Sequence, residues 1–302
     1  MGCRGPNNGQ ASQEGSFVDG LNREVNLSTD VERVVTIAPG ATEIIRVAGG
    51  MDFLKGVSNA DRPESTSTDV ARFSALPLDI EAVVALEPDL ILASDQVNDP
   101  AHAQVFDALG IPIFYLPSSS WEEIQESIHL TGSMLGTQEQ AAAAVDSLAA
   151  RRDALMERTA ASNGRPTAIF LVSHITSYSF GQDSYVLDLM RWAGLDPLMA
   201  EFDTPAPVLD DEWVLLRDPD VILGSFGGDF TPEALLENHP TWRSLSAVRN
   251  DRIINVPYEL ILTPGPRNVE AAWQMAQAAH PTLFADFREA SSGKDQNGPS
   301  QN

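Results

Sequence analysis

Two stretches of the chain read almost alike. Val83–Ser94 is VVALEPDLILAS, and Trp213–Ser225 is WVLLRDPDVILGS. Each stretch ends a predicted helix with an acidic residue and a proline, continues with aspartate and enters a short aliphatic strand. Pro88 and Pro219 mark the helix ends because proline cannot continue a helix. The repeat predicts two similar α/β lobes, although unrelated α/β proteins also contain a helix, Pro-Asp and an aliphatic strand in this order.

Predicted strands and helices alternate on both sides of each stretch, which is the α/β pattern. Strands separated by helices of about ten residues are expected to pair in parallel, with right-handed crossovers. For the first lobe we expect strands at Arg33–Ile37, Lys55–Ser58, Leu90–Ala93 and Ile113–Leu116, with helices at Glu43–Gly49, Asp79–Leu86, Pro100–Leu109 and Trp121–Leu135. For the second we expect strands at Thr167–Val172, Val221–Leu223 and Ile253–Val256, with helices at Tyr185–Ala193, Glu212–Leu216 and Val269–Phe284.

One long helix is predicted between the lobes. Gln138–Ala161 has apolar residues near the helical period and, if wholly helical, spans about 36 Å. We therefore divide the chain into an N-terminal segment (1–30), a first lobe (31–137), a connecting helix (138–163), a second lobe (164–287) and a low-complexity tail (288–302).

The chain is strongly acidic, with 19 basic residues, 43 acidic residues and a net charge of −24. Such a surface repels nucleic-acid phosphates and anionic membranes, so neither is expected as a direct partner. Lys55 and Lys294 are the only lysines, a composition typical of proteins that stay hydrated in high salt. An arginine-rich codon bias explains the same composition equally simply.

Cys3 is the only cysteine, which excludes a disulfide framework and a cysteine metal cluster. A cysteine after a small residue near the N-terminus, followed by the Gly-, Asn- and Ser-rich segment Arg4–Ser16, predicts a lipid-anchored protein on a flexible tether. Pro6 argues against N-myristoylation, which favours Ser or Thr there. We expect a location in the periplasm or at the cell surface; the alternative is a cloning remnant.

Five segments in this order resemble a known family: RVVTIAPGATEII, LDIEAVVALEPDLILAS, LGIPIFYLP, DEWVLLRDPDVILGS and TPGPRNVEAAWQMA. The resemblance covers about Val31–Phe287 and is to the helical-backbone (class III) periplasmic solute-binding proteins of ABC importers. Within this family the sequence is most similar to the vitamin B12-binding members, with siderophore- and haem-binding relatives. It implies two Rossmann-like lobes with parallel sheets, one rigid connecting helix, a ligand cleft between the lobes, and a monomer that delivers a small molecule to permease and ATPase subunits.

The resemblance also implies how the protein meets its permease. Each lobe of the family carries one glutamate that meets arginines of the permease, and the matching positions are Glu43 and Glu212. An arginine–carboxylate pair fixes orientation as well as energy. The alternative is that both are solvated carboxylates at helix starts, where the helix dipole favours them.

The ligand-binding positions that the resemblance implies lie in loops of both lobes. They are Phe73, Asp95, His174, Tyr178, Phe226, Tyr258 and Glu259. Phe73 stands where the family has tryptophan, and Asp95 stands near another tryptophan-like position. These departures leave the ligand open between a corrinoid and a ferric siderophore or haem. Arg62, Arg72 and Arg267 are candidates for binding carboxylates of an anionic ligand.

An enzyme is the competing class of function. The chain has no G-x-S-x-G, Walker, G-x-G-x-x-G or H-E-x-x-H motif, and its five histidines show no i, i+4 pair. A two-lobed α/β enzyme with a cofactor in its cleft would need cysteines for a cluster or histidines for a metal. We therefore expect no catalytic residues, no resident metal and no cofactor.

Overall fold

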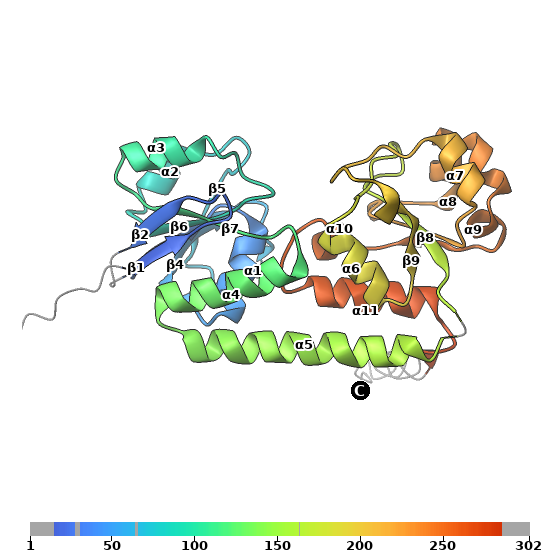
Figure 1. The fold of residues 1–302 in the computed structure, drawn as a ribbon. Coiled ribbons are helices and arrows are strands. Elements are labelled where there is room, and N and C mark those ends of the chain that lie inside the picture. Colours follow the sequence, from blue (N-terminus) through green and yellow to red (C-terminus); the bar gives the residue numbers. More distant parts are fainter. Residues whose placement is uncertain (1–14, 28–30, 64–65, 163, 286–302) are drawn as a thin grey trace, which may run out of the picture. The chain divides into compact units, whose positions relative to one another are not determined.

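The computed structural model describes residues 15–27, 31–63, 66–162 and 164–285 (Figure 1). The chain divides into two compact units. Unit 1 comprises the residues up to Ser118 together with Glu122–Val145, and unit 2 comprises Ser119–Trp121 together with the residues from Asp146 onward. Cys3 and the C-terminal tail lie outside the described residues.

Unit 1 contains a five-stranded parallel sheet in the order β5-β4-β3-β6-β7. Its strands are β3 Val34–Thr36, β4 Leu54–Ser58, β5 Ala71–Phe73, β6 Leu90–Ser94 and β7 Ile113–Leu116. Its helices are α1 Pro39–Val47, α2 Ile80–Val84 and α3 His102–Ala108, with the 3-10 turn η1 Met51–Phe53. Two longer helices follow, α4 Trp121–Leu135 and α5 Gln138–Ala160, and α5 runs from unit 1 into unit 2.

The main core of unit 1 lies between the sheet and helices α2 and α3. Val35, Ile91 and Tyr115 point from neighbouring strands into one buried cluster with Val83 of α2 and Phe106 of α3. Because side chains alternate along a strand, the intervening residues face the opposite side, which α1 covers (Figure 1). Both faces of the sheet are thus buried, as the continuous apolar strands require.

A β-hairpin precedes the sheet. Strands β1 Gly15–Val18 and β2 Glu24–Leu27 pair antiparallel. This hairpin was not predicted, and the predicted flexible tether is wrong at its C-terminal end because Gly15 and Ser16 belong to β1. Each strand is only four residues long, and the alternation in β2 is too short to identify a strand from the sequence.

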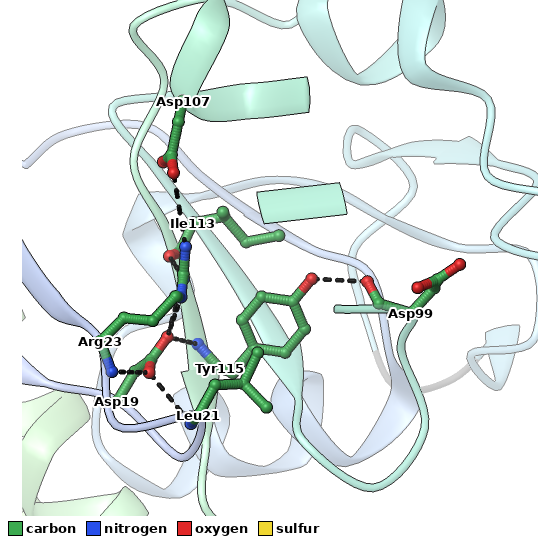
Figure 2. Close-up of polar contacts among 7 residues, drawn as sticks. All are labelled: Asp19, Leu21, Arg23, Asp99, Asp107, Ile113 and Tyr115. Carbon is green, nitrogen blue, oxygen red and sulfur yellow. Dashed lines mark hydrogen bonds and ion pairs between the residues drawn. The ribbon is translucent and has the colours of Figure 1, made fainter. Parts of the chain in front are cut away.

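Asp19 and Arg23 hold the hairpin turn against the sheet, as Figure 2 shows. Arg23 donates two hydrogen bonds to Oδ2 of Asp19, at 3.0 and 2.7 Å, and a third to the carbonyl of Ile113, at 2.7 Å. Its guanidinium also lies 5.2 Å from the centre of the Tyr115 ring. The side chain of Asp19 is fully buried, so this pair ties the hairpin to β7 from inside the protein.

Unit 2 contains a four-stranded parallel sheet in the order β11-β10-β8-β9. Its strands are β8 Thr167–Leu171, β9 Asp196–Pro197, β10 Val221–Gly224 and β11 Ile253–Asn255. Its helices are α6 Tyr185–Trp192, α7 Asp211–Arg217, α8 Pro232–Asn238, α9 Ser246–Arg249, α10 Tyr258–Ile261 and α11 Asn268–Ala279, with 3-10 turns η3 Leu198–Glu201 and η4 Pro240–Ser244. The α/β class with two parallel sheets is as predicted.

The repeated Pro-Asp pairs perform the same task in both units. In unit 1, Oδ2 of Asp89 accepts a hydrogen bond of 2.9 Å from the backbone N–H of Arg33, just before β3. In unit 2, Oδ2 of Asp220 accepts one of 2.9 Å from the N–H of Thr167, which begins β8. Each aspartate therefore accepts a hydrogen bond from the start of the first strand of its sheet. That strand pairs with the strand that the aspartate precedes.

Most predicted elements occur within two or three residues of their expected bounds, and strand Ile113–Leu116 and helix Trp121–Leu135 match both ends. The predicted closing helix Val269–Phe284 is wrong at its C-terminal end, since α11 stops at Ala279. His280 leaves the helical conformation because it precedes Pro281, and the proline ring disfavours helical backbone in the preceding residue. Among the described residues, none of the helices combines the length and the apolar character needed to cross a membrane.

Candidate functional site

Each sheet reverses its direction of growth at one point. In unit 1 the chain adds β4 and β5 on one side of β3 and then β6 and β7 on the other. In unit 2 it adds β9 on one side of β8 and then β10 and β11 on the other. Open parallel sheets bind ligands outside the carboxyl ends of their strands at such switch points. We call the loops that follow these ends the carboxyl edge of each sheet.

Exposed apolar side chains gather at both carboxyl edges. The loops after β5 and β6 expose Leu76 and Val97, by 82% and 45%. In unit 2 the exposed side chains are Ile175, Tyr178, Val208 and Tyr258. Val208 belongs to this edge because it forms a β-bridge with Tyr178, in the loop after β8. Grouped apolar exposure of this kind marks a binding surface, whereas single exposed residues do not.

An aromatic cluster lies at the switch point of unit 2. His174 follows β8 and Phe226 follows β10, and their ring centroids are 6.4 Å apart. Phe230 completes the cluster, with its centroid 5.9 Å from that of His174 and 4.2 Å from that of Phe226. Phe226 is almost fully buried, while His174 and Phe230 are half-buried. The fold thus brings together two predicted ligand residues, His174 and Phe226.

Ser225 adds a polar group beside this cluster. It is 8% exposed, and its hydroxyl oxygen is buried with no hydrogen-bond partner among the described residues. Its backbone N–H bonds the carbonyl of Leu171, so Ser225 sits where β8 and β10 meet at the switch point. Buried hydroxyl groups are normally paired, so an unpaired one beside a candidate site is available to a ligand or water.

The remaining predicted ligand residues of unit 2 are accessible. Tyr178 is 51% exposed and Tyr258 is 57% exposed. Glu259 is half-buried beside Tyr258 in α10, which follows β11. Phe73 of unit 1 differs, because it is 4% exposed and belongs to the main core of that unit. Little of its ring is left for a ligand to contact.

Asp95 lies at the switch point of unit 1, directly after β6. Its Oδ1 accepts a hydrogen bond of 2.7 Å from the hydroxyl of Ser118, which follows β7. Its Oδ2 accepts one of 3.1 Å from Nε2 of Gln96. Burial raises the pKa of the Asp95 carboxyl above its ordinary value, and the bond from Ser118 opposes the rise. Asp95 therefore presents a polar, partly desolvated carboxyl group.

A cavity of about 610 Å³ adjoins Asp95 in unit 1. It is formed by the loops after β5 and β6, and the exposed side chains Leu76 and Val97 both line it. His102 closes one side, with a buried Nδ1 atom that has no hydrogen-bond partner among the described residues. The volume falls in the range typical of small-molecule sites.

Asp61, in the loop after β4, is a second carboxyl group at this edge. It is only 4% exposed, and its Oδ2 has no hydrogen-bond partner among the described residues. Its pKa is raised to about 6, mainly by burial and to a smaller extent by the nearby charge of Glu43, while Thr42 and Arg72 oppose the rise. The sequence analysis did not single out Asp61, because nothing in its surroundings in the sequence indicates burial.

Arg72 is not free to receive an anionic ligand. Its guanidinium donates a hydrogen bond of 2.7 Å to the carbonyl of Asp61 and one of 2.9 Å to the carbonyl of Arg62. It therefore fixes the loop after β4. The proposal from the sequence that Arg72 binds a ligand carboxylate is not supported by this arrangement.

The two candidate docking glutamates have different surroundings. The side chain of Glu43 in α1 is only 13% exposed and forms an ion pair of 3.2 Å with Arg46. Glu212 in α7 is exposed.

Cys3, the predicted lipidation site, lies outside the described residues. Within those residues, His, Cys, Asp and Glu side chains do not gather in any group of three or more that could hold a metal ion.

Comparisons with known proteins agree with this architecture. A family model described as periplasmic binding protein matches residues 34–260. A relative from Bacillus subtilis (strain 168), named "Uncharacterized ABC transporter substrate-binding lipoprotein YvrC", is 24% identical over 275 residues, which cover 89% of this chain and 86% of the relative.

Two solved structures share the fold. The periplasmic vitamin B12 binding protein BtuF of Vibrio cholerae aligns with a TM-score of 0.68 at 26% identity, covering 82% of this chain and 96% of that chain. The periplasmic heme-binding protein RhuT from Roseiflexus sp. RS-1 also aligns with a TM-score of 0.68, at 22% identity, covering 83% of this chain and all of that chain. The chain belongs to the periplasmic binding protein family and is, like the proteins it matches, a substrate-binding protein of a transport system rather than an enzyme.

Proposed function

We propose that this chain captures a corrinoid and delivers it to an ABC importer. The observation that carries the proposal is the carboxyl edge of unit 2, whose loops carry the half-buried rings of His174 and Phe230 together with exposed Tyr178 and Tyr258. A corrin is a broad, flat macrocycle. Aromatic rings and exposed apolar side chains offer such a ligand a large contact area at low entropic cost.

The charge of unit 1 favours a corrinoid over haem. Asp61, Asp95 and Glu43 all lie at or beside the carboxyl edge of its sheet, and Arg72 is held by backbone carbonyls. A haem bound at this edge of unit 1 would bring its propionates against these carboxyl groups without a compensating cation from Arg72. The neutral amide side chains of a corrinoid would instead donate hydrogen bonds to them, so the same charges are favourable.

Glu43 and Glu212 are proposed as the residues that meet the importer's permease. Of the two, Glu212 is the more accessible, so we assign it the larger share of the docking contact.

Cys3 is proposed as the lipid-anchored residue, a role supported by the word lipoprotein in the name of the Bacillus subtilis relative. Labelling cells with a radioactive fatty acid tests it: label should appear on the unaltered chain and disappear with Cys3→Ser.

Thermal unfolding with candidate ligands tests the ligand class. The full chain with Cys3→Ser is heated with cyanocobalamin, cobinamide, haem or a ferric hydroxamate. A ligand present at a hundred times its Kd stabilises the folded state by about 2.7 kcal/mol, so a true ligand raises Tm by several degrees. Stabilisation by cyanocobalamin or cobinamide is expected. Stabilisation by haem or the hydroxamate, with none by either corrinoid, contradicts the proposal.

A matched pair of variants places the ligand at the proposed edge. Tyr178→Ala removes an exposed ring at the carboxyl edge of unit 2, and Leu109→Ala removes an exposed side chain at the end of α3, far from that edge in the sequence. Tyr178→Ala should weaken corrinoid binding about fivefold, because a lost aromatic contact costs on the order of 1 kcal/mol. Leu109→Ala should leave it unchanged.

A further inference from the structure

Helix α7 exposes two leucines that the ligand site does not account for. Leu216 is 76% exposed and Leu215 is 36% exposed. They lie three and four positions after Glu212, so the three side chains share one face of the helix. Val214 is fully buried and fixes the opposite face against unit 2. We call Glu212, Leu215 and Leu216 the α7 patch.

Glu212 differs from the carboxylates around it. Asp210 caps the helix and accepts a 2.7 Å hydrogen bond from the backbone N–H of Glu212. Asp211 accepts hydrogen bonds from Trp242 at 2.9 Å and Thr241 at 3.0 Å. Asp218 accepts from the backbone and hydroxyl of Ser246, at 2.6 and 2.7 Å. These neighbours are used inside unit 2, whereas the Glu212 side chain is exposed.

The nearest arginine of the helix is also occupied. Arg217 forms an ion pair of 2.7 Å with Glu201 and lies over the Trp213 ring, on a different face of α7. The α7 patch therefore presents one acidic group beside two apolar side chains, without a cation of its own helix to neutralise it. A complementary surface would carry a cation surrounded by apolar groups.

We propose that the α7 patch docks on the importer's permease, with Leu215 and Leu216 entering apolar surface next to the cation that meets Glu212. This inference rests on the proposed function and adds the burial of two leucines to the docking contact of Glu212. The net charge of −24 gives the apolar contact a physical reason, because so acidic a composition is typical of proteins that work in high salt. An interface held by charge alone weakens as salt screens it, whereas apolar burial does not.

Crosslinking in cells identifies what covers the patch. A photoreactive p-benzoylphenylalanine replaces Leu216, Glu212 or, as the control, Leu109 in the full chain, and crosslinked proteins are identified by mass spectrometry. The permease subunit is expected from positions 216 and 212 but not from 109. A permease crosslink at 212 without one at 216 overturns the inference and leaves the proposed docking intact. Its absence from both positions overturns both.

The contribution of the two leucines is measured as the affinity of the chain for the permease so identified. The permease is held with its ATPase in lipid nanodiscs. Leu215→Ser with Leu216→Ser should weaken binding tenfold or more, because it removes two apolar side chains from the interface, and should leave the salt dependence of the affinity unchanged. Glu212→Gln should reduce the salt dependence. Leu109→Ser should do neither. Unchanged affinity of the double serine variant overturns the inference, and an unchanged cyanocobalamin-induced shift in Tm shows that ligand capture is intact.

Discussion

The ring of Phe226 occupies the space that a side chain on Gly224 would need. A methyl group built on Gly224 would lie 2.1 Å from Cε1 and Cζ of that ring and 2.8 Å from the carbonyl oxygen of Leu171. Glycine at the end of β10 therefore allows Phe226 to fold back over the strand and to meet His174 and Phe230.

Gly224→Ala should consequently displace the aromatic cluster. Overpacking at such a site costs about 1–3 kcal/mol of unfolding free energy, and corrinoid affinity should fall with it because the ring surface moves. Denaturant unfolding and ligand titration measure the two effects. Gly228→Ala is the control, since a methyl group there meets nothing within 4 Å. Equal behaviour of the two variants would show that Phe226 is not held by Gly224.

Arg23→Ala should destabilise unit 1 strongly. It leaves the fully buried carboxylate of Asp19 without its cation, and removing one partner of a buried ion pair costs about 3 kcal/mol or more. The control is Arg243→Ala, whose ion pair with Glu233 is more than half exposed and should contribute little, because water screens it. Urea unfolding compares the variants, and similar losses would contradict a buried role for Arg23.

Asp61→Asn should change how stability depends on pH. The folded pKa of Asp61 is about 6, above the ordinary value of 3.8, so the folded state binds this proton more tightly than the unfolded chain. Its contribution is therefore fully present below about pH 4 and is lost as pH rises through 6. The difference of about 2 pKa units corresponds to ~3 kcal/mol.

The unfolding free energy of Asp61→Asn, relative to that of the unaltered chain, should thus be higher at pH 7 than at pH 4. Unfolding free energies at these two pH values give the comparison. Asp229→Asn, at an exposed position of unit 2, is the control and should leave the pH profile as it is. A parallel profile for Asp61→Asn would contradict the buried, raised-pKa carboxyl.

His280 should act in the opposite direction. Its Nε2 lies 3.0 Å from the carbonyl of Ala193, which can only accept, so Nε2 carries the proton and Nδ1 accepts from the hydroxyl of Ser162 at 3.3 Å. Burial lowers the pKa of His280. Its contribution is present above the unfolded value, about 6.5, and is lost as pH falls through the lowered folded value.

His280→Gln should therefore remove part of the loss of stability between about pH 7 and pH 5. His129→Gln, on the exposed side of α4, is the control. Because Asp61 and His280 lie in different units and oppose each other over this window, the double variant should show the two changes added. A pH profile unaltered by His280→Gln would contradict the neutral, buried imidazole.

The sequence by itself determined the repeated architecture. The Pro-Asp pairs, the aliphatic strands and the helix period are local signals, and each structural consequence lies within a few residues of its cause. Glu87 and Asp218, the residues before the two prolines, both adopt left-handed backbone, with φ of 48° and 42°. Helix α7 ends next to Asp218, whereas α2 ends at Val84, three residues before Glu87. In both units proline blocks any longer helix, and this could be predicted from the chain alone.

Only the tertiary structure decided which candidate residues belong to the site. Phe73 matched a family position, yet β5 directs it into the core. Asp61 and Ser225 were not predicted as site residues, yet folding buries both at the carboxyl edges of the sheets. The hairpin at Gly15–Leu27 was missed because the partners of Arg23, Ile113 and Asp107, lie far from it in the sequence. Burial and the pKa shifts that follow from it arise from residues distant in sequence, and no local pattern encodes them.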